Sequence, residues 1–582
     1  MFHLLHSLLS QNTDHSSYRT LKTQNSKLNP ISHFSEFRQA MSTLFLILFV
    51  FSHSLCVLQT QGLNSADEVN DSLTYLWPLP SEFTFGNKTL SVHPQLSLVV
   101  GGNGGNSSIL RLGFDRYKAI IFKNSHGVSS FDRIRGRRLS YDVTKLKVVV
   151  HSDSEDLQLG VDESYTLFVL KKDGQSIVGE ATIEANTVYG ALRALETFSQ
   201  LCTFDYGSKS VQVYRAPWYI RDSPRFAYRG LLLDTSRHYL PVDVIKQVIE
   251  SMSYAKLNVL HWHVIDRESF PLEVPSYPKL WKGSYTKWER YTVEDAIEIV
   301  SFAKTRGINV MAEIDVPGHA ESWGAGYPNL WPSTSCKEPL DVSKSSTFDV
   351  VSGILTDMRK IFPFELFHLG GDEVNTTCWS STRHVKQWLE QHNMTTKDAY
   401  QYFVLKAQEI AISKNWTPVN WEETFNTFPT KLNPKTVVHN WLGSGVCPKA
   451  VAKGFRCIFS NQGVWYLDHL DVPWEAAYNA EPLEGIDDVS QQKLVLGGEV
   501  CMWGETADTS DVQQTIWPRA AAAAERLWSR REATSARNGN LTALPRLQYF
   551  RCLLNRRGVQ AAPVTNLIAR SPPIWSGSCY DQ

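Results

Sequence analysis

The chain has 582 residues, of which 42% are hydrophobic and 20% charged, so it is long enough for more than one domain with a large core. Its 58 Lys and Arg residues nearly balance its 59 Asp and Glu residues, and the net charge is -1. We find no basic stripe or repeated aromatic and basic pattern, which excludes the usual features of nucleic-acid binding and favours neutral partners.

An N-terminal extension and signal segment are expected within residues 1–61. From Met41 the chain reads "MSTLFLILFVFSHSLCVLQTQG", in which Leu44 to Phe51 form an apolar block followed by small and polar residues, as in a signal peptide. The block is far shorter than the roughly 20 residues of a membrane-spanning helix, so no stable membrane span is expected; an uncleaved anchor is the alternative. The polar residues before Met41 are either a mis-assigned start or a disordered extension.

Entry into the secretory pathway predicts N-glycosylation and disulfide bonds. Asn-x-Ser/Thr sites occur at Asn70, Asn87, Asn106, Asn375, Asn393, Asn415 and Asn540. Of the nine cysteines, Cys56 lies in the signal segment. Cys501 lies in the apolar run "LGGEVCMWGE" and is expected to be a buried free thiol, so not all of the others need pair.

Residues 76–218 have the pattern of a small α/β domain. The runs "LKVVV", "YTLFVL" and "ATIEA" are typical of strands. The run "VYGALRALETFSQL" predicts an amphipathic helix with an apolar face formed by Val188, Ala191, Leu192, Leu195 and Phe198. The adjacent acids Asp162 and Glu163 precede one of the strands, so we expect them to be structural.

Residues 225–582 contain eight short apolar segments, each ending in polar or aromatic residues and separated by helical patterns. The segments cover 230–238, 258–266, 308–319, 364–373, 417–423, 436–441, 456–461 and 494–505. Two intervening stretches, "VDVIKQVIESMSYAK" and "VEDAIEIVSFAKTRG", have helical spacing, and the second ends at Gly307 as a helix cap would. This alternation predicts a (β/α)8 TIM barrel with a C-terminal extension, and a doubly wound open sheet is the alternative.

Chemically active side chains gather at the carboxyl ends of these segments, where barrel active sites lie. They are Asp234, Arg237, Asp266, Asp315, His319, Asp372, Glu373, Trp421, Trp441, Trp503 and Glu505. Aromatic faces beside carboxylates suggest a sugar site, in which one carboxylic acid protonates the leaving oxygen and a second group acts as nucleophile. Asp372 and Glu373 are adjacent, and neighbouring side chains of extended backbone point in different directions. The nucleophile is therefore expected elsewhere, and the 2-acetamido group of the substrate is one source.

The motifs "HLGGDE", "LLLDTSRHYLP", "LNVLHWHVID", "AEIDVPGHA" and "LGGEVCMWGE" resemble those of β-N-acetylhexosaminidases of glycoside hydrolase family 20, in order and spacing, across roughly residues 76–580. "EVNTTCW" and "WYLDH" are similar to the plant vacuolar type. The resemblance implies no cofactor. We expect no metal either, because no His, Cys and Asp cluster has ligand spacing along the sequence.

The resemblance also implies roles for residues at matching positions. Glu373 would be the general acid and then the base, Asp372 would hold the acetamido N–H and stabilise an oxazolinium-like intermediate, and Tyr466 would hydrogen-bond the acetamido oxygen. Trp421, Trp441 and Trp503 would enclose the acetamido methyl group. Arg237, Glu505 and Asp468 would bind ring hydroxyls. Asp266 and His319 would form a polar relay behind Glu373.

The same resemblance implies disulfides between Cys336 and Cys378 and between Cys552 and Cys579, with Cys202, Cys447 and Cys457 left open. His261 and His263 are expected to be packed barrel residues, and Trp379 and Trp465 core residues. Two positions depart from the family pattern: Glu268 stands where Gln is frequent, and His469 stands where many animal relatives have Leu.

Together these features predict a glycosylated exo-enzyme of the secretory pathway, in the vacuole or alternatively outside the cell. It would remove terminal β-linked N-acetylglucosamine or N-acetylgalactosamine from N-glycans or chito-oligosaccharides with retention of configuration. A homodimer is one option for its oligomeric state. The rivals are an inactive glycan-binding protein, which would be expected to lose the acid, and a family 18 chitinase, whose Asp-x-Asp-x-Glu pattern is absent from the sequence.

Overall fold

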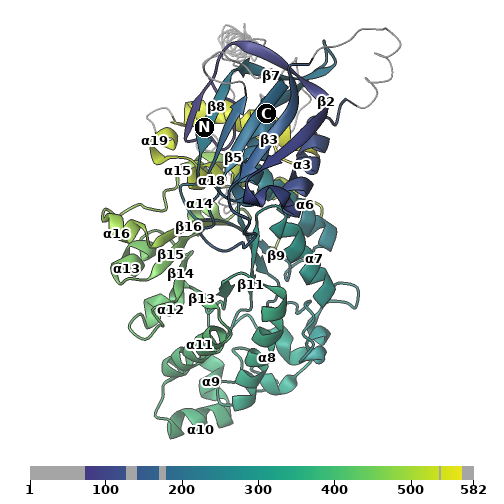
Figure 1. Cartoon of the computed structure of the whole chain (residues 1–582). Coiled ribbons are helices and arrows are strands. Elements are labelled where there is room, and N and C mark those ends of the chain that lie inside the picture. The colour runs from purple at the N-terminus through teal and green to yellow at the C-terminus, as the bar shows by residue number, and fades with distance from the viewer. Residues whose placement is uncertain (1–72, 126–140, 170–178, 536–538, 566–582) are drawn as a thin grey trace, which may run out of the picture. The chain divides into compact units, whose positions relative to one another are not determined.

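The computed structural model describes residues 73–125, 141–169, 179–535 and 539–565, all within one compact unit that spans Asn70–Gln582 (Figure 1). The predicted signal segment, the glycosylation site at Asn70 and the cysteine at Cys579 lie outside these residues. None of the helices in these four ranges is long and apolar enough to cross a lipid bilayer.

The first part of the chain forms a sheet of eight strands in the order β1-β8-β4-β5-β3-β2-β7-β6. The strands are β1 (Glu82–Thr84), β2 (Lys88–Gly101), β3 (Val143–Val150), β4 (Tyr165–Val169), β5 (Gly179–Ala185), β6 (Cys202–Asp205), β7 (Ser210–Ala216) and β8 (Trp218–Asp222). Strands β3, β4 and β5 coincide with the three runs that predicted strands. Helices α3 (Ser108–Ile121) and α5 (Val188–Leu201) and the 3-10 turn η1 (Asn103–Asn106) complete the expected small α/β fold.

Helix α5 is buried along its whole length and not on one face alone. Its predicted apolar face belongs to the core of the first sheet. Elsewhere on the helix, Arg193 donates to the carbonyl oxygen of Gly307, at 2.8 Å, and to the carboxylate of Glu163. Glu163 also pairs with Arg229 of the barrel at 2.7 Å. A buried carboxylate with two guanidinium partners is well compensated, so Glu163 has a structural role that ties the sheet to the barrel.

Eight parallel strands close into a barrel in the order β10-β11-β12-β13-β14-β15-β16-β9. They are β9 (Tyr228–Asp234), β10 (Val259–His263), β11 (Asn309–Glu313), β12 (Leu366–His368), β13 (Thr417–Trp421), β14 (Val437–Asn440), β15 (Arg456–Phe459) and β16 (Val495–Met502), coloured teal to green in Figure 1. The predicted (β/α)8 barrel is therefore confirmed, and the alternative of an open sheet is wrong.

Helices and turns connect the barrel strands, and four more helices within the described ranges follow the last strand. Helices α6 (Val242–Tyr254) and α7 (Val293–Lys304) are the two predicted from helical spacing. Helix α7 ends three residues before Gly307, whose φ of 68° is a left-handed conformation that glycine adopts readily. The others are η2 (Pro278–Gly283), η3 (Glu321–Ala325), η4 (Pro328–Leu330), α8 (Ser345–Ile361), α9 (Thr377–Ser381), α10 (Arg383–Gln391), α11 (Thr396–Ser413), α12 (Glu422–Thr427), α13 (Val446–Ala452), α14 (Gln462–Trp465), α15 (Trp474–Asn479), α16 (Val489–Gln492), α17 (Val512–Ile516), α18 (Arg519–Trp528), α19 (Arg531–Thr534) and α20 (Gly539–Arg557).

The barrel interior changes from apolar to polar and then to aromatic groups along its axis. Alternate residues of each strand point inward. An apolar cluster contains Tyr228, Val259, Met311, Val419 and Ile458. A group of fully buried charged and imidazole side chains follows: His261, Glu313, His368, His439 and Glu499. Leu232, Trp421, Tyr466 and Cys501 then form the cluster nearest the carboxyl ends, and Cys501 is a free, buried thiol. Trp379 and Trp465 are fully buried core residues.

Candidate active site

Two glycines form the hinge between β12 and the adjacent acids. Gly370 and Gly371 have φ values of 60° and 96°, and a Cβ on Gly370 would lie 1.9 Å from the carboxylate of Asp315. Only glycine allows so tight a turn here. Glu373 also has a left-handed φ, 46°, which costs a residue with a side chain about 1–3 kcal/mol. The turn buries Asp372 and leaves the side chain of Glu373 57% exposed.

His319 lies between this acidic pair and a third carboxylate. Its Nε2 is 3.5 Å from Glu373 Oε2 and 3.7 Å from Asp372 Oδ2, and its Nδ1 is 3.0 Å from Asp266 Oδ1. Burial opposes a charge on the imidazole, but the surrounding carboxylates, Asp372 foremost, raise the pKa of His319. The contact with His319 in turn lowers the pKa of Glu373. The geometry is that of a polar relay from Asp266 to Glu373.

Asp315, which the sequence placed among the side chains at the carboxyl ends of the strands without a role, stands beside Asp372. Its Oδ1 accepts the backbone N–H of Gly371 at 2.8 Å. Burial and then the charge of Asp372 raise the pKa of Asp315 well above its ordinary value. A proton on Asp315 therefore allows two carboxyl groups to remain adjacent in a buried position.

Arg237 is surrounded by four carboxylates. The nitrogen–oxygen distances are 2.9 Å to Asp234, 2.8 Å to Asp266, 3.1 Å to Glu268 and 3.6 Å to Glu505. Glu268, one of the two departures from the family pattern, thus adds a carboxylate to the contacts of Arg237. Burial and then Asp266 raise the pKa of Glu268.

Three tryptophans and a tyrosine form an aromatic box. Ring centroids are 6.1 Å apart for Trp421 and Trp503, 6.0 Å for Trp503 and Tyr466, and 6.3 Å for Tyr466 and Trp441. Two indoles are anchored from behind by glutamate side chains: Trp421 Nε1 donates to Glu313 and Trp441 Nε1 to Glu423, each at 3.0 Å. These anchors fix the orientation of two walls of the box.

One cavity of ≈ 200 Å³ brings together every predicted catalytic and substrate-binding residue. Its lining consists of Arg237, Asp266, His319, Asp372, Glu373, Trp421, Trp441, Tyr466, Asp468, Trp503 and Glu505, with His263, Asp315, Gln462 and His469 in addition. The cavity is smaller than the 300–1,000 Å³ usual for drug-sized ligands, which suits a single sugar ring.

The four additional lining residues differ in how far the sequence pointed to them. Asp315 was recognised by its position at the carboxyl end of a strand segment, but the resemblance gave it no role. His263 was expected to be packed; it is 1% exposed, yet it also contributes to the cavity wall. His469 was noted as a departure from the family pattern, whereas Gln462 comes from the segment after β15, where no periodic pattern distinguishes a lining residue from a surface one.

Three groups of His and carboxylate side chains within the described ranges have donor atoms within 4.8 Å of one another, close enough for a metal ion. They are His261, His439 and Glu499; His261, Glu313 and His368; and Asp315, His319 and Asp372. The first two combine residues from different strands, so spacing along the sequence does not reveal them. Hydrogen bonds already join members of these groups, for example His261 Nδ1 and Glu499 at 2.8 Å.

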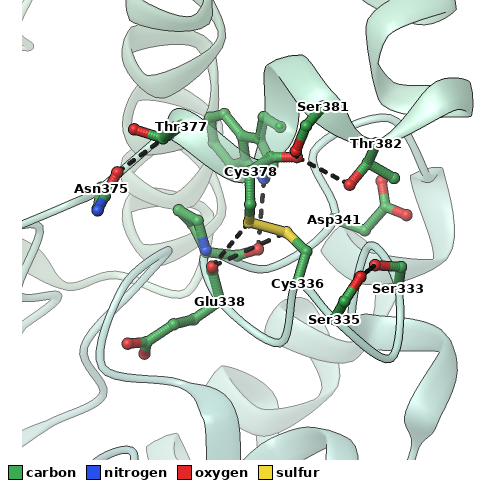
Figure 2. The surroundings of a disulfide bond; sticks show 12 residues. Ser333, Ser335, Cys336, Glu338, Asp341, Asn375, Thr377, Cys378, Ser381 and Thr382 are labelled. Atoms are coloured by element: carbon green, nitrogen blue, oxygen red, sulfur yellow. Dashed lines mark hydrogen bonds between the residues drawn. A yellow bond between two sulfur atoms is a disulfide. The ribbon is translucent and has the colours of Figure 1, made fainter.

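A disulfide between Cys336 and Cys378, the pair implied by the resemblance, holds the loop beside the acidic pair. Figure 2 shows it joining the loop that carries Glu338 to the start of α9, close to Asn375, whose side-chain oxygen accepts the N–H of Thr377. The loop after β11 is thereby tied to the segment that follows Glu373.

The structure shows the bonding state of the other described cysteines. Cys447 and Cys457, whose pairing the sequence left open, form a second disulfide, and Cys202 is free. Cys552 is disulfide-bonded, and its expected partner Cys579 lies outside the described residues.

The glycosylation motifs are accessible wherever they are described. The exposed asparagines are Asn87, Asn106, Asn375, Asn393 and Asn415, and Asn540 is half-buried. Carbohydrate attachment at these positions stays a prediction.

Two family models match this chain. "Glycosyl hydrolase family 20, catalytic domain" matches residues 226–531, and "beta-acetyl hexosaminidase like" matches residues 76–201. The chain is 72% identical to Beta-hexosaminidase 1 of Arabidopsis thaliana, with 93% of this chain and 100% of that protein aligned. It is 55% identical to Beta-hexosaminidase 3 of the same plant, over 87% of this chain and 94% of that protein.

A solved structure shares the fold. The chitobiase of Flavobacterium johnsoniae superposes with a TM-score of 0.72 at 28% identity, covering 85% of this chain and 74% of that chain.

Proposed function

Because this chain belongs to glycoside hydrolase family 20, we propose that it is an exo-acting, retaining β-N-acetylhexosaminidase. It removes terminal N-acetylglucosamine or N-acetylgalactosamine from the non-reducing ends of N-glycans or chito-oligosaccharides. A cavity of ≈ 200 Å³ supports cleavage at a chain end, because it suits one sugar ring and not an extended glycan.

The observation that carries the proposal is a buried acceptor beside the aromatic box. Asp372 Oδ1 has no hydrogen-bond partner among the described residues, although the residue is only 9% exposed. An orphaned buried acceptor is costly unless a ligand supplies a donor. The acetamido N–H of the substrate is such a donor, and the aromatic rings nearby suit its methyl group.

The reaction then proceeds in two steps without a protein nucleophile. The acetamido oxygen, held by the Tyr466 hydroxyl, attacks the anomeric carbon while Glu373 gives its proton to the departing glycosidic oxygen. Asp372 stabilises the positive charge of the resulting oxazolinium ion. Glu373 next takes a proton from a water molecule that attacks the same carbon and reopens the ring. Two inversions restore the β configuration.

His319 and Asp266 influence the pH at which Glu373 is protonated. Since the contact with His319 lowers the pKa of Glu373, the protonated acid is available mainly at acidic pH. An acidic optimum is therefore expected, which fits the vacuole as the proposed location. The extracellular space is the alternative.

The decisive experiment compares three aryl β-glycosides that differ only at C2: the N-acetylglucosaminide, the glucosaminide and the glucoside. The first should be hydrolysed with a far higher kcat/KM, because only it contains an acetamido oxygen. NMR should detect the β anomer as the first product, and a thiazoline analogue of the intermediate should inhibit strongly. Comparable kcat/KM for the glucoside, or an initial α product, would refute the mechanism.

A further inference from the structure

Glu313 is a buried carboxylate at the end of β11 that joins two parts of the site. It is fully buried and does not line the cavity. Its Oε1 accepts the indole N–H of Trp421 at 3.0 Å and also lies 2.8 Å from His368 Nδ1. Its Oε2 is 2.5 Å from His263 Nδ1 and 3.0 Å from His261 Nε2. The two carboxylate oxygens of Glu313 thus contact different parts of the site, one in the direction of Trp421 and the other in the direction of His263.

The first direction leads to the aromatic box. Trp421 lines the cavity and is 1% exposed. Its indole nitrogen is a donor only, so the acceptor behind it determines how the ring faces the cavity. Glu313 is that acceptor.

The second direction leads to the proton relay. His263 Nε2 lies 2.8 Å from Asp266 Oδ2, and the other oxygen of Asp266 is 3.0 Å from His319 Nδ1. His319 Nε2 is in turn 3.5 Å from Glu373 Oε2. The path from Glu313 to the acid therefore consists of alternating carboxylates and imidazoles.

A negative charge on Glu313 suits its contacts with N–H groups. Burial opposes protonation of His263, but Glu313 foremost, with Asp266, raises the pKa of His263 to about 10. A carboxylate accepts on both oxygens, whereas an amide accepts on only one. Glutamate can hold Trp421 and a protonated His263 together, and glutamine cannot.

We propose that Glu313 is a positioning residue for the hydrolysis reaction, which sets the indole of Trp421 in the acetamido box and, through His263, the relay behind Glu373. The inference rests on the proposed function, because it assigns these two groups to binding and to proton transfer. Glu313 touches neither substrate nor reacting atoms and acts through its neighbours.

The test is Glu313→Gln, assayed on p-nitrophenyl N-acetylglucosaminide, its N-butanoyl analogue and chitobiose. A loss of about 10- to 100-fold in kcat is expected, by analogy with side chains that orient metal ligands from behind. The loss should be larger for chitobiose, whose poor leaving group depends more on the acid. Preference for N-acetyl over N-butanoyl should also fall, because Trp421 no longer has a fixed orientation.

Glu499→Gln is the matched control. Glu499 is equally buried in the same barrel, but it contacts Tyr228 and His261 and has no hydrogen bond to Trp421 or His263 among the described residues. It should lower thermal stability and reduce kcat/KM by one common factor for all three substrates. If Glu313→Gln also changes all three by one factor, Glu313 is only structural and the proposal is wrong.

Two further outcomes are informative. If Glu313→Gln does not fold, Glu313→Asp keeps the carboxylate but shortens its reach toward Trp421 and His263, and unchanged acyl preference in that variant would overturn the proposal. If the wild-type enzyme itself shows no preference for N-acetylglucosaminides over glucosides, the proposed function fails first and the role of Glu313 with it. A preference that is present in the wild type and unaltered in Glu313→Gln contradicts the inference alone.

Discussion

At the scale of single residues, Glu373 is the group whose removal should affect catalysis without affecting the fold. Its side chain is 57% exposed, so Glu373→Gln should leave the melting temperature nearly unchanged. The variant lacks the proton donor, and kcat should fall by about 10²–10⁴-fold. Thermal melting and kcat on chitobiose measure the two effects. The exposed Glu409→Gln is the control, and near wild-type turnover by folded Glu373→Gln would refute the assignment.

Glu423 gives a prediction about pH. Burial and then the charge of Asp372 raise its pKa from 4.5 to about 8. Between pH 4.5 and about 8, the Glu423 carboxyl group is ionised in the unfolded chain but still protonated in the folded chain. This tighter proton binding stabilises the folded state. The stabilisation is fully present below pH 4.5 and is lost as pH rises through about 8, at up to about 1.4 kcal/mol per pH unit.

Glu423→Gln cannot ionise and still offers an oxygen to Trp441. Relative to the wild type, its free energy of unfolding should therefore increase as pH rises from 4.5 to 8. Denaturant titrations at several pH values measure this difference, with Glu409→Gln as a surface control. Parallel stability curves for Glu423→Gln and the wild type would show that Glu423 has an ordinary pKa when folded.

The sequence predicted the residues that face the cavity better than those that support them. Asp372, Glu373 and Trp421 lie in motifs at strand ends, where barrel active sites lie. Glu313 and Glu423 form their key hydrogen bonds with residues 18 to 108 positions away, and no local pattern reports such a contact. Support of this kind becomes visible only once the barrel brings its strands together.

At the scale of elements, the disulfide between Cys336 and Cys378 closes a loop with a sequence separation of 42 next to the acidic pair. Cys378→Ser should lower the free energy of unfolding by about 2–4 kcal/mol and should also lower kcat, because the loop after Glu373 loses its tether. Cys447→Ser, which opens a loop of separation 10, is the control and should reduce stability with little effect on kcat. Equal kcat for Cys378→Ser and the wild type would show that the tether does not serve the site.

All eight barrel strands were predictable as elements, but their lengths were not. The segment 364–373 contains β12, which spans only Leu366–His368. The residues of this segment after His368 leave the strand, pass through the left-handed turn of Gly370 and Gly371 and form part of the site. Apolar patterning indicates where a strand lies, whereas the point at which a functional loop leaves the sheet depends on tertiary contacts such as that with Asp315.

At the scale of the whole molecule, Glu163 links the first sheet to the barrel. Glu163→Gln leaves Arg193 and Arg229 buried with less compensation, and removal of one partner of a buried ion pair costs about 3–5 kcal/mol. We expect one cooperative unfolding transition that moves to lower denaturant concentration. Asp162→Asn, at the exposed neighbouring acid, should change stability by no more than about 0.5 kcal/mol. Two separate transitions in the wild type would contradict a shared fold.

Helix α5, enclosed on all sides, also constrains how the protein is made. The ribosome completes the first sheet at Asp222, but Trp528, which donates a hydrogen bond to Asp222, follows 306 residues later. At about 5–20 residues per second, this stretch takes roughly 15–60 s to synthesise. Until then the barrel that covers one side of α5 is incomplete. We therefore expect the nascent chain to be most prone to aggregation between the completion of the first sheet and the completion of the barrel.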